Sequence, residues 1–252
     1  MKEKSAKNKT IDMSVEEGRK YFERCIQFES EKTFLTDGFA AAASGNRNVL
    51  LPGQIIDKTI CGDTFSVLPA VPQNFADLAI VDPPYNLYKN YGGNVFSEKN
   101  ADEYCEYTKK WLLLLLPVLK ATASVYICCD WKSSVQIAGV LTDFEREEKL
   151  FVQNRITWER EKGRGALKNW KNSMEDIWFC TKDKNNYAFN LDAVKIRRKV
   201  VAPYKKDGVP KDWEETSRGN FRNTCPGNFW DDISVPYWSM PENTAHPTQK
   251  PE

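Results

Sequence analysis

Histidine is almost absent from this sequence of 252 residues, in which His246 is the single example. A metal site built from several histidines and a Ser-His-Asp hydrolase are therefore poorly supported. The seven cysteines are an odd number and include no Cys-x-x-Cys pair. This pattern predicts reduced, mostly buried thiols, and it speaks against a disulfide framework or a zinc site. We expect no bound metal.

Long apolar runs are also lacking. The best candidate, residues 111–119, is too short to span a bilayer and contains Pro117. The N-terminal residues 1–10 are charged and have no apolar core of the kind found in signal peptides. The fractions of hydrophobic residues, 41%, and charged residues, 28%, are ordinary for a globular domain. We expect a cytoplasmic protein without a membrane partner.

A strong net charge is missing too, since 36 Lys and Arg face 35 Asp and Glu. The charge is nevertheless uneven, because residues 160–222 hold 16 Lys and Arg against 9 Asp and Glu. A basic segment on a neutral protein is typical of a local nucleic-acid contact surface. On charge alone, a solvated charged face is the simpler interpretation.

The spacing of apolar residues predicts strands that alternate with helices, which indicates an α/β sheet. Residues 195–240 are rich in Lys, Arg, Pro, Gly and aromatic residues without a clean period, which predicts irregular structure or an insertion on the core. Residue 14 is a plausible N-cap for a helix over 14–28. The predicted strands are 55–61, 76–81, 123–129, 151–158 and 176–180, and the predicted helical segments are 65–68, 102–116 and 131–141.

The strongest local signal is the Asp-Pro-Pro-Tyr stretch formed by Asp82, Pro83, Pro84 and Tyr85, directly after the apolar run 76–81. That run has the length of a buried parallel strand, and two prolines prevent it from continuing. Ligands of open α/β sheets bind beyond the carboxyl ends of strands. A carboxylate, two rigid prolines and an aromatic ring at this place predict a polar pocket with a stacking face.

These residue types suit methylation of an exocyclic base amine. The lone pair of such an amine is delocalised into the ring, so the nitrogen is a poor nucleophile. Asp82 accepting one N–H and the Pro83 carbonyl accepting the other would draw the nitrogen toward tetrahedral geometry and free the lone pair for attack on a sulfonium methyl group. Tyr85 offers a face for an unstacked base. The simpler alternative is that the prolines only end a strand and Tyr85 packs.

Further stretches follow in a fixed order: Cys61-Gly62-Asp63, VDPPYNL over 81–87, ITWE over 156–159, EDIWFCTK over 175–182, YAFNLDAV over 187–194, and HPTQKP over 246–251. Together they resemble the circularly permuted beta group of DNA amino-methyltransferases of restriction–modification systems. The resemblance implies a Rossmann-like S-adenosylmethionine-dependent methyltransferase sheet and double-stranded DNA as partner. The chain departs from the group at Met174, where the family often has histidine before the glutamate.

In this group Asp-Pro-Pro-Tyr usually accompanies adenine N6 methylation, and Ser-Pro-Pro-Tyr usually accompanies cytosine N4 methylation. Adenine N6 is therefore favoured here, with cytosine N4, methylation of RNA or protein, and a non-catalytic DNA-binding subunit as alternatives. A glycine-rich turn that holds the cofactor would follow HPTQKP in the family, so the C-terminal part of the cofactor half is expected to be missing. Three explanations stay open: the chain is a fragment, a second polypeptide completes the pocket, or the gene has decayed.

The resemblance divides the chain into an N-terminal extension (1–53), a catalytic core (54–182), an irregular DNA-recognition insertion (183–240) and the start of the cofactor half (241–252). Asp63 has even odds of approaching the cofactor or only capping a helix. The implied cofactor contacts are Asp63, Asp82, His246, Pro247, Thr248, Gln249 and Lys250. The candidate DNA contacts are Arg160, Lys162, Arg164, Lys168, Lys195, Arg197, Arg198, Lys199, Lys205 and Lys206, each of which is as readily a solvated charge.

Overall fold

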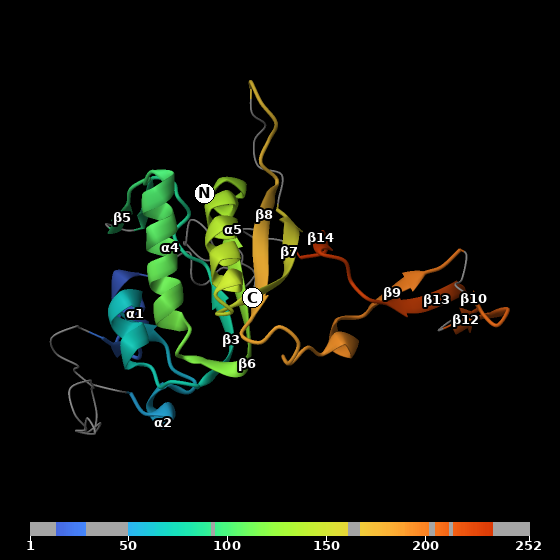
Figure 1. Ribbon diagram of the computed structural model, residues 1–252, viewed down its shortest axis with the longest axis horizontal. Coiled ribbons are helices and arrows are strands. Elements are labelled where there is room, and N and C mark those ends of the chain that lie inside the picture. The colour runs from blue at the N-terminus through green and yellow to red at the C-terminus, as the bar shows by residue number, and fades with distance from the viewer. Residues whose placement is uncertain are drawn as a thin grey trace.

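A computed structural model describes residues 14–28, 50–91, 94–160, 167–201, 205–211 and 214–233 (Figure 1). Its centre is a five-stranded mixed sheet in the order β14-β7-β8-β6-β3. β3 pairs in parallel with β6, whereas β8 runs antiparallel to both β6 and β7, and β14 is parallel to β7. The strands are β3 (Ala76–Val81), β6 (Leu119–Cys129), β7 (Phe151–Glu159), β8 (Met174–Thr181) and β14 (Phe229–Trp230). The α/β sheet predicted from the sequence is confirmed.

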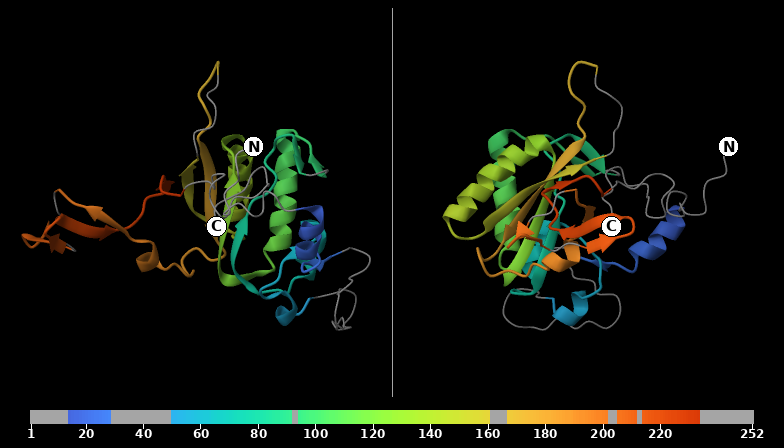
Figure 2. Two further views of the ribbon diagram at one scale, coloured as in Figure 1. Left: turned by 180° about the vertical axis from the view of Figure 1, so that it is seen from behind. Right: turned by 90° about the vertical axis from the view of Figure 1, so that its right-hand side faces the viewer.

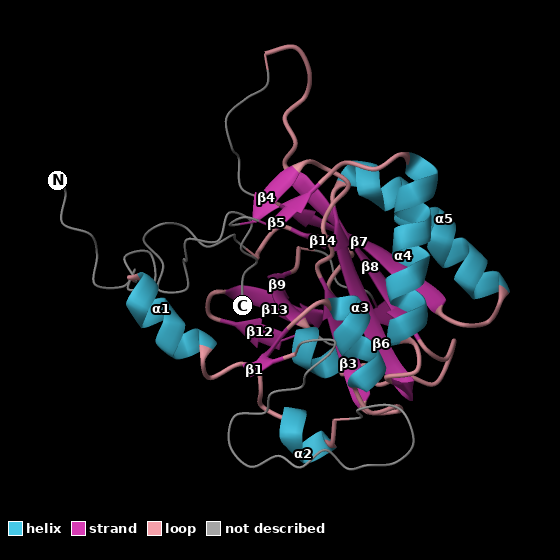
Figure 3. Ribbon diagram, turned by 90° about the vertical axis from the view of Figure 1, so that its left-hand side faces the viewer, coloured by secondary structure: helices cyan, strands magenta, loops and turns pink. Residues whose placement is uncertain are grey.

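Two helices, α4 (Ala101–Leu115) and α5 (Trp131–Arg146), pack side by side on one face of this sheet (Figure 3). Each begins at a side-chain cap. Asn100 accepts the N–H of Glu103 at 2.9 Å, and the Glu103 carboxylate accepts the Asn100 N–H in return. Asp130 accepts the N–H of Ser133 at 2.9 Å and so starts α5 directly after β6. The helices predicted over 102–116 and 131–141 are confirmed, and α5 continues for five residues beyond the prediction.

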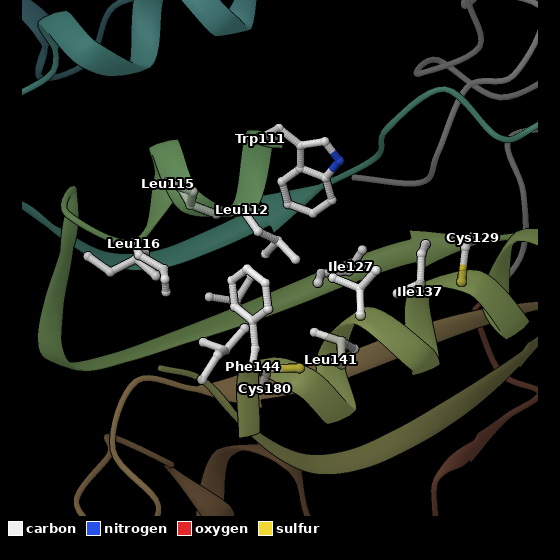
Figure 4. Close-up of a cluster of buried hydrophobic side chains, with 14 of the residues drawn as sticks. Trp111, Leu112, Leu115, Leu116, Ile127, Cys129, Ile137, Leu141, Phe144 and Cys180 are labelled. Atoms are coloured by element: carbon white, nitrogen blue, oxygen red, sulfur yellow. The ribbon is translucent and has the colours of Figure 1, made fainter. Parts of the chain in front are cut away.

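The main hydrophobic core lies between these helices and the sheet (Figure 4). Helical spacing brings Trp111, Leu112 and Leu115 of α4 to the same side, opposite Ile137, Leu141 and Phe144 of α5. Val125, Ile127 and Cys129 of β6 point into the cluster from the sheet, since alternate residues of a strand share one face. Burial of each large apolar side chain stabilises the fold by about 1.5–3 kcal/mol.

β3 is only half buried, although its apolar sequence predicts a strand that is covered on both faces. Ala79 and Val81 pack against the helical core, while Leu78 and Ile80 point to the opposite face, where Ile80 is 72% exposed. β6 is the only neighbour of β3 within the described residues. The expectation of full burial is therefore wrong for the described part of the chain.

The N-terminal elements form a small separate cluster around Leu50, Ile55 and Ala70. Strand β2 is shorter than the predicted strand 55–61, because Pro52 starts a helical turn that takes up Ile55. Gly62 is required at its position, since a Cβ there would lie 2.8 Å from the carbonyl oxygen of Phe28. The elements are α1 (Val15–Phe22), β1 (Ile26–Gln27), α2 (Pro52–Ile55), β2 (Ile60–Cys61), α3 (Thr64–Val67) and the 3-10 turn η1 (Leu68–Ala70), with β1 parallel to β2.

The region expected to be irregular contains several short strands. After the 3-10 turn η2 (Leu191–Val194), an antiparallel sheet with the order β12-β13-β9 extends away from the central sheet (Figures 1 and 2). β14 then returns to the edge of the central sheet beside β7. The bounds are β9 (Ile196–Lys199), β10 (Lys205–Lys206), β11 (Val209–Pro210), β12 (Glu214–Thr216) and β13 (Gly219–Thr224). A further hairpin pairs β4 (Lys89–Tyr91) with β5 (Asn94–Phe96).

All seven cysteines are free thiols, but only Cys128, Cys129 and Cys180 are buried. The expectation of mostly buried thiols is therefore wrong, since Cys61 and Cys225 are exposed. No helix in the described part of the chain is long and apolar enough to cross a membrane.

Candidate active site

The Asp82–Tyr85 stretch lies at the carboxyl end of β3, beside the carboxyl end of β6, where α/β sheets bind ligands. The Asp82 side chain is exposed and Pro83 is buried. The Tyr104 hydroxyl of α4 donates a 3.0 Å hydrogen bond to the carbonyl oxygen of Pro84. The turn is therefore held from the helical side while the carboxylate stays accessible.

Asn86 fixes the far side of the same turn. Its backbone N–H donates to the hydroxyl of Ser133 at 3.0 Å, which connects the turn to the first turn of α5. Its side-chain amide pairs with the backbone of Lys99, donating to the carbonyl and accepting from the N–H, each at 2.8 Å. These bonds tie the ends of β3 and β6 together and explain why the motif continues into Asn86.

Tyr85 is held by a buried carboxylate of β8, the strand on the far side of β6. Its hydroxyl donates to Oε2 of Glu175 at 2.8 Å, and Oε1 of Glu175 forms a short ion pair with Arg160. Glu175 is 2% exposed, so its charge depends on these partners. Burial of the phenol, followed by the negative charges of Glu175 and Asp82, raises the pKa of Tyr85 well above its usual value. Tyr85 is therefore a neutral hydrogen-bond donor at physiological pH.

The sequence reasoning placed Glu175 in a stretch that resembles the strands around the family's base pocket, but it did not assign Glu175 a contact with Tyr85 or Arg160. Glu175 lies on β8 opposite Trp158 of β7, and this register places it beside the end of the sheet. Arg160 follows β7 directly, and its guanidinium lies 5.8 Å from the centre of the Trp158 ring. The sequence signal that could have indicated this contact is a glutamate next to an apolar stretch of a strand, because a glutamate is rarely buried without a partner.

The predicted cofactor contacts are only partly described. Asp63 lies at the start of α3 and accepts the hydroxyl of Ser66 at 3.3 Å, but its side chain does not cap a backbone N–H. Phe65, two residues further on, packs edge-to-face on Tyr107 of α4. His246, Pro247, Thr248, Gln249 and Lys250 lie outside the described residues.

The predicted DNA contacts fall into two groups. Three of these cations form ion pairs within the chain: Arg160 with Glu175, Lys195 with Asp192 at 2.6 Å, and Arg197 with Glu214 at 2.6 Å. Arg197 also lies over the ring of Phe221 at 4.9 Å. The other described members, Lys168, Arg198, Lys199, Lys205 and Lys206, are exposed, as are Lys195 and Arg197, whereas Lys162 and Arg164 lie outside the described residues.

An aromatic cavity of about 540 Å³ lies on the face of β6 and β8 opposite the two helices. The rings of Tyr126 and Phe179 stack at 4.8 Å on its floor. Arg198 of β9 and Trp230 of β14 also line it, so the outlying sheet and the returning strand both contribute. The cavity is separate from the residues around Asp82 that line the carboxyl end of β3.

The residues present fit the acceptor side of a methyl-transfer site. Asp82 is an exposed anion beside a fixed aromatic ring, and the outer face of β3 next to it leaves Ile80 exposed. An accessible carboxylate is electrostatically compatible with a sulfonium cation. Within the described residues, the turn from Asp82 to Leu87 contains no glycine.

The fold and this edge define an α/β protein with an Asp-Pro-Pro-Tyr turn, its candidate ligand site, at the carboxyl ends of β3 and β6. A family model described as DNA methylase matches residues 76–252, which is more than half of the chain. The chain belongs to this DNA methylase family, and the resemblance to DNA amino-methyltransferases is confirmed. Membership supports S-adenosylmethionine as the cofactor.

Two relatives by sequence agree with the family. The chain is 31% identical over 195 residues to the Type II methyltransferase M.HpaI of Haemophilus parainfluenzae, covering 77% of this chain and 56% of that protein. It is 31% identical over 202 residues to the DNA adenine methyltransferase YhdJ of Escherichia coli (strain K12), covering 77% of this chain and 64% of that protein. The solved PvuII DNA methyltransferase, described as cytosine-N4-specific, shares 14% identity at a TM-score of 0.42, covering 70% of this chain and 56% of that one. The chain thus spans somewhat more than half the length of these relatives.

Proposed function

We propose that this chain carries the methyl-acceptor site of a DNA methyltransferase of the restriction–modification type, and that it acts on adenine N6 in double-stranded DNA. The observation that carries the proposal is the exposed Asp82 carboxylate beside Tyr85, whose ring is fixed through Glu175. The family match supports DNA as the substrate. Adenine is favoured over cytosine because the motif begins with Asp82, as argued from the sequence.

The target base must leave the duplex to reach this edge. A flipped base that rests against Tyr85 would place its amino group between the Asp82 carboxylate and the Pro83 carbonyl. Proline has no N–H, and its restricted φ holds that carbonyl in a constant direction. The two acceptors would take both amino hydrogens in hydrogen bonds and free the nitrogen lone pair.

S-adenosylmethionine, when bound, would supply an electrophilic methyl group. Its transfer from sulfur to the amino nitrogen would leave that nitrogen cationic, with one proton to give up. Asp82 is placed to hold the cationic nitrogen by its charge and to receive the proton before it passes to water. The residues expected to contact the cofactor are Asp63, Asp82 and the segment 246–250.

The exposed outer face of β3 supports a further element of the proposal. Leu78 and Ile80 are both more than half exposed on a strand whose described part has a neighbour on one side only. A further segment or a second polypeptide that covers this face would complete the cofactor pocket. Titration of S-adenosylmethionine into the 252-residue chain alone tests this element: saturable binding would show that the pocket is complete without such a partner.

The proposed activity is tested by incubating the protein with labelled S-adenosylmethionine and mixed-sequence duplex DNA, followed by nucleoside analysis. N6-methyladenine is the expected product, and N4-methylcytosine would overturn the choice of base. The Asp82→Asn variant keeps the shape of the side chain but removes its charge, so methyl transfer should fall by about 100-fold or more. If the wild type transfers no methyl group, although both it and Asp82→Asn bind DNA, the result would instead favour a non-catalytic DNA-binding subunit.

A further inference from the structure

The connection between β7 and β8 rises directly from the candidate active site. Its base is closed by a 2.8 Å hydrogen bond from the Arg160 N–H to the carbonyl oxygen of Ser173. The same Arg160 forms the ion pair with Glu175, which in turn holds Tyr85. β7 ends and β8 begins at the edge of the sheet where β6 ends, and the described limb of the connection, residues 167–173, projects beyond that edge (Figure 1).

The described limb of this connection, residues 167–173, displays two large apolar side chains to solvent. Leu167 is 102% exposed and Trp170 is 94% exposed. Lys168 and Lys171 alternate with them, and neither lysine forms an ion pair with another described residue. Exposing an indole to water is unfavourable, and two cations flank this one, so its placement indicates a partner that is both apolar and anionic.

We propose that this limb enters the DNA duplex beside the target base and that Trp170 stacks in the space that the flipped base leaves. The inference rests on the proposed function and extends it to a residue that positions the substrate. Apolar side chains inserted between base steps partly unstack them, and an indole offers a flat face to the neighbouring bases. Lys168 and Lys171 then meet the backbone phosphates on either side.

Charge complementarity favours DNA as the occupant over a second polypeptide. The two lysines belong to the basic segment 160–222, and no acidic residue occurs between Leu167 and Ser173. The limb is also continuous, through Arg160 and Glu175, with the turn that would receive the base. A protein partner covering Trp170 would have to bring carboxylates to both ammonium groups, whereas every nucleotide step of DNA supplies a phosphate next to a base face.

The test needs no knowledge of the recognised sequence. Binding of the full chain to two labelled duplexes is measured by fluorescence anisotropy, one duplex intact and the other carrying a single abasic site. A residue that fills a vacated position should make the wild type prefer the abasic duplex by at least about fivefold. Trp170→Ala should lose this preference while it still binds the intact duplex, and Trp170→Phe should retain most of it.

A matched control is Tyr21→Ala, which removes an exposed aromatic ring from α1. It should leave the preference unchanged. An unchanged preference in Trp170→Ala, or an equal loss on both duplexes, would overturn the role of Trp170 even if the wild type methylates DNA. If the wild type binds neither duplex, the proposed function fails and this inference fails with it. Circular dichroism of Trp170→Ala is expected to match the wild type, because the side chain is 94% exposed.

Discussion

The Tyr85 hydroxyl donates a 2.8 Å hydrogen bond to Glu175, a residue that lies 90 positions later in the chain. The bond joins the turn after β3 to the start of β8, across the end of β6. Because Glu175 is also paired with Arg160, one buried carboxylate fixes the aromatic face of the site and the base of the connection between β7 and β8.

Replacing Glu175 by Gln should weaken both the site and the fold. The change removes the negative charge that pairs with Arg160, although an amide oxygen can still accept from Tyr85. We expect the free energy of unfolding to fall by about 1–3 kcal/mol, since Arg160 is partly exposed and solvent compensates part of the loss. Urea titration measures this change. The control Glu106→Gln breaks an exposed pair with Lys109 and should cost less than about 0.5 kcal/mol. Equal losses of unfolding free energy in the two variants would show that Glu175 contributes no more to stability than an exposed ion pair does.

Tyr85→Phe should change the dependence of stability on high pH. The pKa of Tyr85 is raised in the folded protein by burial and by the charges of Glu175 and Asp82. The stability that this phenol contributes is therefore fully present below the unfolded pKa, near 10, and is lost as the pH rises above it, at about 1.4 kcal/mol per pH unit. Burial also raises the pKa of Tyr104, Cys129 and Cys180, so they add to the same slope. Unfolding free energies measured from pH 8 to 11 should fall less steeply in Tyr85→Phe, and parallel slopes would contradict the raised pKa.

Two adjacent leucines of α4 provide a test of the core. Leu112 is fully buried between α4 and the sheet, whereas its neighbour Leu113 is about half exposed. Leu112→Ala should lower the free energy of unfolding by about 2–5 kcal/mol, because it removes buried methyl groups and leaves a cavity. Leu113→Ala should cost less than about 1 kcal/mol. Chemical denaturation of both variants checks the assignment of the helix face, and a reversed order would mean that α4 is rotated.

The exposed cations of β10 should contribute to DNA affinity through phosphate contacts. Lys205→Ala should reduce the slope of log K against log salt by about 0.9, the effect of one lost phosphate contact. Anisotropy titrations at several salt concentrations measure the slope. Lys120→Ala is the matched control, since Lys120 pairs with Asp77 at 2.7 Å near the opposite end of β3. A slope that changes equally in both variants would place the DNA elsewhere.

The sequence by itself determined the α/β core. The pattern of apolar residues predicts helices over 102–116 and 131–141, which are α4 and α5, and apolar runs predict β3, β6 and β8. The Asp82–Tyr85 motif was recognisable because prolines end a strand locally, without help from the rest of the chain. Family membership followed from several such local motifs in a fixed order.

Tertiary structure decided what depends on pairing between distant segments. The Glu175 contact with Tyr85 arises from the register of β8 between β6 and β7, and strand register is not encoded by any single segment. The exposure of Ile80 on the outer face of β3 could not be predicted, because the apolar composition of a strand does not reveal how many of its faces are covered. The antiparallel sheet of β9, β12 and β13 escaped prediction because its strands are short, polar and stabilised mainly by one another. Local physics thus set the elements and the motif, and long-range packing set which side chains meet around it.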